Sequence, residues 1–215
     1  MLYFAANNGV NGYEIWKSDG TEAGTVMVKD INPGANGSMW FLSPFFTNVN
    51  GTVFFKADNG VNGEELWKSD GTDAGTVMIK NISAGSNNSS PASLINIGSI
   101  LYFSADDGIN GIELWKSDGT EPGTVMVKDI KASSNSSSPA SLTNINGVLY
   151  FSADDGANGV EVWKSDGTES GTVLVKDIFN GPGGSNPSLF TLVNGVTAFA
   201  ADDGMSGREL WRSDG

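Results

Sequence analysis

The chain has 215 residues, a formal net charge of −13, and neither histidine nor cysteine. The missing residue types exclude Ser-His-Asp and Cys-His nucleophilic sites, zinc sites of the usual nitrogen and sulfur kind, histidine-held haem and disulfides. The acidic excess repels phosphate backbones, so nucleic acid is not an expected partner.

Aromatic residues make up 10% of the chain, which is enough to build a core, so we expect a folded protein. No apolar run approaches the roughly 20 residues of a membrane-spanning helix. The chain also does not begin with a basic segment followed by an apolar stretch. The sequence therefore predicts no membrane span, and its abundant Asn, Ser, Gly and Thr favour an extracellular location.

Five tryptophans recur at nearly constant spacing and define an internal repeat. They are separated by 51, 48, 48 and 48 residues and lie at Trp16, Trp67, Trp115, Trp163 and Trp211. We predict a single repeat domain over residues 1–215, with units at approximately 1–50, 51–98, 99–146 and 147–194 and a half unit at 195–215.

Four short segments follow one another in each unit. In the third unit they read LYFSADDG at 101–108, IELWKSDG at 112–119, TVMVKDI at 124–130 and ASLTNING at 140–147. Each is rich in β-branched and aromatic residues and bounded by Gly, Asn, Asp or Pro, which predicts strands joined by tight reversals. No segment shows a sustained helical stripe, so the fold is predicted to be all-β.

About 48 residues with four antiparallel strands are typical of one β-propeller blade. The first segment has apolar residues on both faces, with Phe103 and Ala105 opposite Tyr102, as expected for a sheet packed between two others. The first two segments occur five times and the last two four times, which predicts eighteen strands. We therefore expect four to five four-stranded antiparallel blades, in a propeller that is incomplete or completed by strands of another chain.

The sequence ELWKSDGTDAGT at 65–76 resembles a bacterial repeat family named after its consensus, Glu-Leu-Trp-x-x-Asp-Gly-Thr-x-x-Gly-Thr. The resemblance covers nearly the whole chain, with Ile15 and Val162 in place of the leucine and a fifth copy that stops before its threonine. It implies a propeller-like fold in large secreted or cell-surface bacterial proteins. It brings no established set of catalytic residues.

The loop after the first segment gathers oxygen-bearing side chains of the kind that Ca²⁺ binds. Calcium is the one cofactor that the sequence suggests. A weak site is predicted in each of two consecutive units, formed by Asp106, Asp107, Asn110 and Glu113 in the first and by Asp154, Asp155, Asn158 and Glu161 in the second. The alternative is that Asp, Asn and Gly are the best turn formers and serve only the turn.

The Ser-Asp-Gly-Thr turn and the glutamate before each tryptophan recur along the chain. The recurrence of the turn favours a structural role, through hydrogen bonds to the local backbone, over sugar binding. The glutamates are candidates for the paired acids of a glycosidase, or for partners of the Lys or Arg that follows the tryptophan. Because every copy carries the same carboxylates, we expect a protein that is not an enzyme.

The first connector differs from the others and contains an apolar cluster of Trp40, Phe41, Phe45 and Phe46. An exposed cluster of this kind forms a contact patch for a carbohydrate or a protein. Alternatively, it fills the space beside an incomplete blade.

These features favour a non-enzymatic, extracellular repeat protein with a structural or adhesive role, whose unpaired terminal strands join copies into a fibre. The expected partners are other copies of the chain or a longer parent chain. The alternative is a lectin-like propeller that binds glycans weakly at each repeat and gains avidity from repetition.

Overall fold

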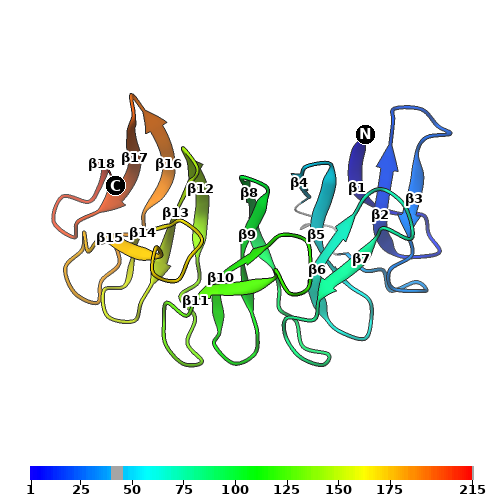
Figure 1. The fold of residues 1–215 in the computed structure, drawn as a ribbon, viewed down its shortest axis with the longest axis horizontal. Coiled ribbons are helices and arrows are strands. Elements are labelled where there is room, and N and C mark those ends of the chain that lie inside the picture. The colour runs from blue at the N-terminus through cyan, green and yellow to red at the C-terminus, as the bar shows by residue number, and fades with distance from the viewer. Residues whose placement is uncertain (40–45, 215) are drawn as a thin grey trace.

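The computed structural model describes residues 1–39 and 46–214, which form eighteen strands and no α-helix (Figure 1). All strands lie in five antiparallel sheets. The all-β prediction and the predicted number of strands are therefore confirmed. The described residues include no helix whose length and apolar character would let it cross a membrane.

We number the sheets 1 to 5 in chain order. Sheet 1 contains β1 (Leu2–Asn7), β2 (Tyr13–Ser18) and β3 (Val26–Lys29). Sheet 2 contains β4 (Thr47–Val49), β5 (Thr52–Asp58), β6 (Glu64–Ser69) and β7 (Val77–Lys80). Sheet 3 contains β8 (Ala92–Ile97), β9 (Ile100–Asp106), β10 (Ile112–Ser117) and β11 (Val125–Lys128). Sheet 4 contains β12 (Ala140–Ile145), β13 (Val148–Asp154), β14 (Val160–Ser165) and β15 (Val173–Lys176), and sheet 5 contains β16 (Ser188–Val193), β17 (Val196–Asp202) and β18 (Arg208–Ser213).

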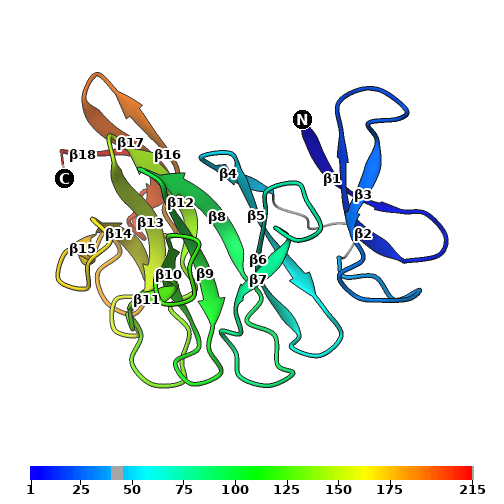
Figure 2. The same cartoon turned by 45° about the vertical axis from the view of Figure 1, so that its right-hand side comes forward.

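The five sheets stand side by side in chain order, with the two termini at opposite ends of the row (Figures 1 and 2). The strands β4, β8, β12 and β16 contact one another between sheets, and we call them the inner strands. The strands β3, β7, β11 and β15 form the opposite edge of their sheets, and we call them the outer strands. This arrangement of sheets around a row of inner strands is propeller-like.

An Asn-Gly pair makes the tight reversal after an inner strand. Asn146 and Gly147 have φ angles of 53° and 87°. Positive φ at both loop residues is characteristic of the type I′ turn that joins two antiparallel strands in a tight hairpin. The Asn144 side chain also accepts a hydrogen bond from the Gly147 amide at 2.8 Å. The pair therefore fixes where the chain turns and which residues face each other across β12 and β13.

The core lies between the sheets. The tryptophan face of a sheet carries the repeated tryptophan, and in sheet 3 it includes the fully buried Phe103. The leucine face is the opposite one and carries the Leu, Ile or Val that precedes the tryptophan. At each internal interface, the leucine face of one sheet packs on the tryptophan face of the next, as Leu66 of sheet 2 does with Phe103 and Trp115 of sheet 3.

The sheets are offset by one strand from the units read in the sequence, because the last segment of each unit forms the inner strand of the following sheet. Sheets 2, 3 and 4 have four strands each. Within the described residues, sheet 1 has no inner strand and sheet 5 has no outer strand. The four-stranded blade is thus confirmed for three sheets, while the two terminal sheets have three strands each.

Candidate functional site

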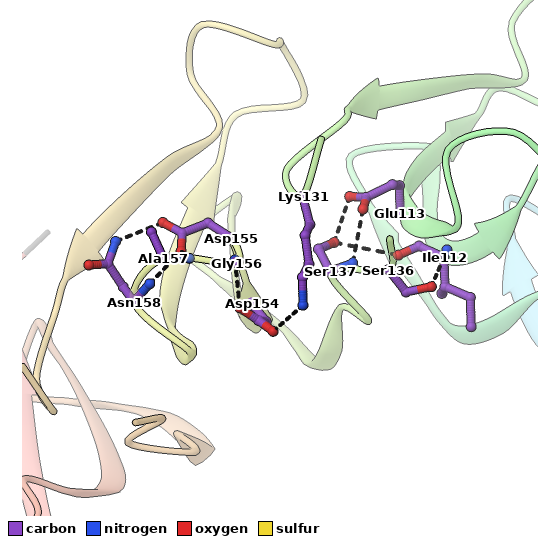
Figure 3. A network of polar contacts seen from close by, with 10 residues as sticks. All are labelled: Ile112, Glu113, Lys131, Ser136, Ser137, Asp154, Asp155, Gly156, Ala157 and Asn158. Atoms are coloured by element: carbon purple, nitrogen blue, oxygen red, sulfur yellow. Dashed lines mark hydrogen bonds and ion pairs between the residues drawn. The ribbon is translucent and has the colours of Figure 1, made fainter. Parts of the chain in front are cut away.

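The glutamate before the repeated tryptophan is fully buried in sheets 1 to 4. In sheet 3, Glu113 accepts hydrogen bonds from the Ser137 hydroxyl at 2.6 Å and the Ser137 amide at 2.9 Å (Figure 3), and from the Ile130 amide at 3.0 Å. Ser137 lies in the connector to sheet 4, and Ile130 follows the outer strand β11. Both residues belong to the connector between β11 and β12, so the carboxylate fastens the two ends of this connector to β10.

The same contacts recur in the other sheets. Ser89 and the Ile82 amide donate to Glu65, and Ser185 and the Ile178 amide donate to Glu161. A serine about half a repeat downstream of the glutamate is the sequence signal for this partner, and it lies outside the motif around the tryptophan.

In sheets 1 to 3, the lysine after the tryptophan binds a backbone carbonyl and not this glutamate. The predicted pairing of the two residues is therefore wrong for these sheets. Lys68 donates to the Gly119 carbonyl and Lys116 to the Gly167 carbonyl, each at 2.8 Å and each in the next sheet. Alternation along the strand places the lysine on the leucine face and the glutamate on the tryptophan face. The lysine therefore joins neighbouring sheets, while the glutamate holds the connector that leaves its own sheet.

Burial raises the pKa of the Glu65 and Glu113 carboxyls above their ordinary value, although the serine hydroxyl and backbone amides act in the opposite direction. The pKa of Glu14 is raised by the same cause. A carboxyl of this kind holds its proton more readily in the folded state. Its contribution to stability is therefore present below the ordinary pKa of 4.5 and is lost as the pH rises through the raised folded value.

The aspartates of the Ser-Asp-Gly-Thr turns have the opposite pH dependence. The Thr120 hydroxyl and amide lower the pKa of Asp118. The Thr168 hydroxyl and amide lower the pKa of Asp166 in the same way. Their contribution is present above the ordinary value of 3.8 and is lost as the pH falls below it.

We therefore expect the melting temperature to rise as the pH is lowered from neutrality, to pass through a maximum in mildly acidic solution, and to fall in stronger acid. Protonation also reduces the self-repulsion of a chain with net charge −13. Circular dichroism melts across this pH range measure the profile. A stability that rises steadily up to neutral pH contradicts the prediction.

Of the predicted calcium ligands, Asp107, Asn110, Asp155 and Asn158 lie in the loops between the second and third strands of sheets 3 and 4, Asp106 and Asp154 end the strands before these loops, and Glu113 and Glu161 lie on β10 and β14. The aspartate oxygens bind groups of the protein. Asp107 accepts the Ile109 and Asn110 amides at 2.9 and 2.8 Å, and its second oxygen accepts the Asn110 side-chain amide at 2.7 Å. Asp106 accepts the Gly108 amide at 2.7 Å. Glu113 is not part of this set, because its carboxylate is enclosed by Ser137 and Ile130.

The following unit shows the same pattern. Asp155 binds the Ala157 and Asn158 amides, and Asp154 forms an ion pair with Lys131 at 2.6 Å (Figure 3). Glu161 is again buried among the partners named above. In the part of the chain that is described, no group of three or more His, Cys, Asp or Glu residues is placed to hold a metal ion. Turn formation accounts for the observed contacts, and calcium binding stays an untested prediction.

The Ser-Asp-Gly-Thr turn is held by its own hydrogen bonds. Asp118 accepts the Thr120 amide and hydroxyl at 2.8 and 2.7 Å, and Thr120 accepts the Gly123 amide at 3.0 Å. The Ser117 and Thr124 hydroxyls are hydrogen-bonded to each other at 2.8 Å. These contacts agree with the structural role predicted for the turn.

The predicted apolar contact patch falls mostly outside the described residues, which do not include Trp40, Phe41 or Phe45. Phe46 is described and is partly buried against Phe55, with ring centroids 5.6 Å apart. Phe46 thus packs on the interface between sheets 1 and 2, and a contact patch at this connector stays a prediction.

The repeated tryptophans of the middle sheets are also core residues. Trp67, Trp115 and Trp163 are 6%, 5% and 6% exposed. A sugar stacks on an exposed aromatic face, and these positions do not offer one. Glycan binding at each repeat stays a prediction, which a glycan array tests.

The two ends of the row expose surfaces that are buried at every internal interface. Leu210 on the leucine face of sheet 5 is 81% exposed, whereas the equivalent Leu66 and Leu114 are fully buried. Leu2 on the tryptophan face of sheet 1 is 65% exposed, whereas Leu101 is fully buried. We call these two surfaces the end faces. The repeat register identifies such residues only once the structure shows which sheets have no neighbour.

No family model matches the chain, and no curated protein matches it. Among solved structures it is similar to one from a study of two prolyl endopeptidases, with a TM-score of 0.54 and 12% identity over 98% of this chain and 33% of that one. It is also similar to a puromycin hydrolase mutant, with a TM-score of 0.55 and 12% identity over 94% of this chain and 31% of that one. An α-L-arabinofuranosidase from Clostridium thermocellum ATCC 27405 has a TM-score of 0.34 and 14% identity over 93% of this chain and 80% of that one.

This chain spans about a third of the length of the first two proteins. At 12% identity, the likeness supports the fold alone. Together with the five antiparallel sheets, it places the chain among all-β, propeller-like structures.

The expectation that the chain is not an enzyme is contradicted by the first two neighbours, which come from a study of prolyl endopeptidases and from a puromycin hydrolase, and we withdraw it. The absence of His and Cys excludes particular nucleophilic sites, but a pair of carboxylates hydrolyses glycosides without either residue. A carboxylate that recurs in every repeat can also be catalytic in only one of them. We assign none of the activities of these neighbours to this chain.

Proposed function

We propose that this chain is a repeat scaffold that assembles end to end with further copies of itself, in a structural or adhesive role outside the cell or at the bacterial cell surface. The observation that carries the proposal is the pair of end faces. They present, at opposite ends of one molecule, the two surfaces that pack together at each internal interface. A second copy, or the adjoining units of a longer parent chain, presents a surface whose shape and side chains fit.

The leucine face of sheet 5 forms one half of this contact. Leu210 and Ala198 line a cavity of about 460 Å³ together with Val193 and Val196 of the β16–β17 hairpin. In the middle of the row, such a surface is covered by the Phe and Leu of the following sheet, as in the cluster of Leu114 with Leu149 and Phe151.

The tryptophan face of sheet 1 forms the other half. Trp16 and Gly20 on this side are more exposed than their buried equivalents Trp67 and Gly71. In sheet 2, the Gly71 carbonyl receives a hydrogen bond from Lys17 of the preceding sheet, at 2.7 Å. By the same register, Arg212 of one copy is placed to donate to the Gly20 carbonyl of the next.

An association of this kind is heterologous, since each copy uses a different surface on its two sides. Such contacts form filaments, or rings when the rotation closes. The resemblance of the sequence to a repeat family of secreted or cell-surface bacterial proteins supports the proposed setting. The expected partner is therefore another copy or a longer parent chain, with no role assigned to nucleic acid.

We expect Leu210→Asp to abolish this association without unfolding the chain. A carboxylate at the centre of an apolar contact loses its hydration without gaining a partner, whereas at an exposed position it changes stability by only about 0.5 kcal/mol. Light scattering after size exclusion and negative-stain microscopy measure the assembly, and a thermal melt checks the fold.

Met205→Asp is the matched control, because Met205 is 89% exposed in the loop between β17 and β18. This variant should assemble like the original chain. A strictly monomeric original chain at high concentration, or assembly that survives Leu210→Asp, contradicts the proposal.

A further inference from the structure

Sheets 2 and 3 form a pocket of about 180 Å³ beside the Ser-Asp-Gly-Thr turn of sheet 3, and we call it the interface pocket. A protein cavity of about 150 Å³ holds benzene, so the interface pocket has room for one six-membered ring. The pocket lies between two internal sheets, and neither end of the row contributes to it. Its lining includes Val49, Thr52, Phe54 and Lys68 of sheet 2 and Ser99 and Asp118 of sheet 3.

Two residues of sheet 2 that line the pocket differ from their equivalents in other sheets. Thr52 introduces a hydroxyl where sheets 3, 4 and 5 have an apolar residue, namely Ile100, Val148 and Val196. Phe54 lacks a hydroxyl where sheets 1, 3 and 4 have tyrosine, namely Tyr3, Tyr102 and Tyr150. The wall of the pocket is therefore changed in its polar groups, while the strand that carries it is kept.

A tyrosine hydroxyl fills the equivalent place at the next interface. The Tyr102 hydroxyl of sheet 3 packs so closely on Gly167 of sheet 4 that a Cβ on this glycine would clash with it. Burial and the nearby Asp166 carboxylate raise the pKa of Tyr102. Phe54 lies against Gly119 in the same way but has no hydroxyl. The space beside Gly119 is therefore left for the hydroxyl of another molecule.

Ser99 lies at the pocket in a backbone conformation that favours glycine. Its φ angle is 77°, and a left-handed conformation is unfavourable for a residue with a Cβ. The other hairpins have glycine at this position, namely Gly51, Gly147 and Gly195. Strained residues cluster at sites where the side chain has a use. The strain at Ser99 thus places one more hydroxyl at the pocket.

One positive and one negative side chain line the pocket. Lys68 donates a hydrogen bond to the Gly119 carbonyl at 2.8 Å, which leaves two of its three protons for a ligand. Asp118 uses its Oδ1 atom for the Thr120 amide and hydroxyl. Among the described residues, none donates a hydrogen bond to its Oδ2 atom. Because the two charges cancel and the chain has a net charge of −13, the pocket suits a neutral ligand better than an anion.

We propose that the interface pocket binds a small neutral polyhydroxy ring, of the kind found in a monosaccharide or a cyclitol. One ligand hydroxyl takes the place that a tyrosine hydroxyl occupies between sheets 3 and 4, and it donates to Asp118. Further ligand hydroxyls contact Lys68, Thr52 and Ser99. This site differs from weak glycan binding at each repeat, because the replaced residues meet at one interface. It is also independent of end-to-end assembly.

The test uses the full chain labelled with nitrogen-15 and titrated separately with D-glucose, D-galactose, D-mannose and myo-inositol. We expect at least one of these probes to shift the amide signals of Asn50, Ser99 and Gly119 in a saturable way. Binding of a hexose alone identifies a monosaccharide site, and binding of myo-inositol alone identifies a cyclitol site. The absence of saturable shifts with all these probes, or shifts confined to other sheets, overturns the proposal.

Two variants restore the residue that the other repeats have. Phe54→Tyr should weaken binding at least tenfold, because its hydroxyl occupies the place of the ligand hydroxyl. Ser99→Gly should weaken binding roughly three- to tenfold, through the loss of one hydrogen bond. A thermal melt checks that both variants fold. Binding that is unchanged in Phe54→Tyr contradicts the assigned position of the ligand.

Ser141→Gly is the matched control for Ser99→Gly. Ser141 also has a positive φ, of 56°, but lies on β12 and outside the pocket. This variant should bind the probes like the original chain. Leu210→Asp should bind them equally well, so a failure of end-to-end assembly is distinguishable from a failure of this proposal.

Discussion

Replacing Glu113 with alanine is expected to lower the free energy of unfolding by about 3–5 kcal/mol, because it leaves buried donors without an acceptor. Those donors are the Ser137 hydroxyl, the Ser137 amide and the Ile130 amide. Each unpaired buried donor costs about 1–3 kcal/mol. The lost side chain also leaves a small cavity. Chemical denaturation of the variant and the original chain measures the difference.

Two variants show whether the effect comes from the buried contacts. Glu113→Gln should lose less stability than Glu113→Ala, because the amide oxygen keeps one acceptor for these donors. Glu209→Ala should change stability by only about 0.5 kcal/mol, since this copy of the glutamate is exposed. Equal losses for Glu113→Ala and Glu209→Ala contradict the role assigned to the buried carboxylate.

Phe103→Ala should also destabilise the protein by about 3–5 kcal/mol, the usual cost of removing a buried phenylalanine. Phe103 is fully buried at the interface between sheets 2 and 3, in one cluster with Leu66, Ile79 and Trp115. Strands on either side hold the surrounding backbone, so the vacated space collapses only in part. The same denaturation experiment measures the loss.

Phe103→Leu is the matched variant and should cost only about 1–2 kcal/mol, because much of the side-chain volume remains. Hydrogen exchange should place the loosening in sheets 2 and 3. In a row of repeats, each sheet packs only on its neighbours, so a local defect stays local. A loss spread evenly over all five sheets is the contradicting result.

The repeat itself made much of the fold predictable. The β-branched and aromatic segments at 101–108 and 112–119 overlap β9 and β10, and the loop between these strands has the Asp and Asn contacts expected of a turn. The alternation of Phe103 and Tyr102 predicted a sheet with two buried faces, and both residues are buried. Such patterns are local, and each repeated copy confirms the others.

The partner of Glu113 was not predictable in the same way. The carboxylate lies on β10, and its main donor comes from a connector that returns to the sheet 24 residues later. The sequence around Glu113 favoured the nearby Lys116 as its partner. The alternation of the strand puts the lysine on the other face, where it binds the next sheet, and only the packed structure shows what that face contacts.

The sequence alone determined that this is an all-β protein of repeated four-strand units, because strand and turn preferences act over a few residues and recur in each copy. The tertiary structure decided which residues are core and which are open. Leu114 and Leu210 occupy the same position in the repeat, yet one is fully buried and the other is 81% exposed. Burial depends on whether a neighbouring sheet is present, and no local segment encodes that.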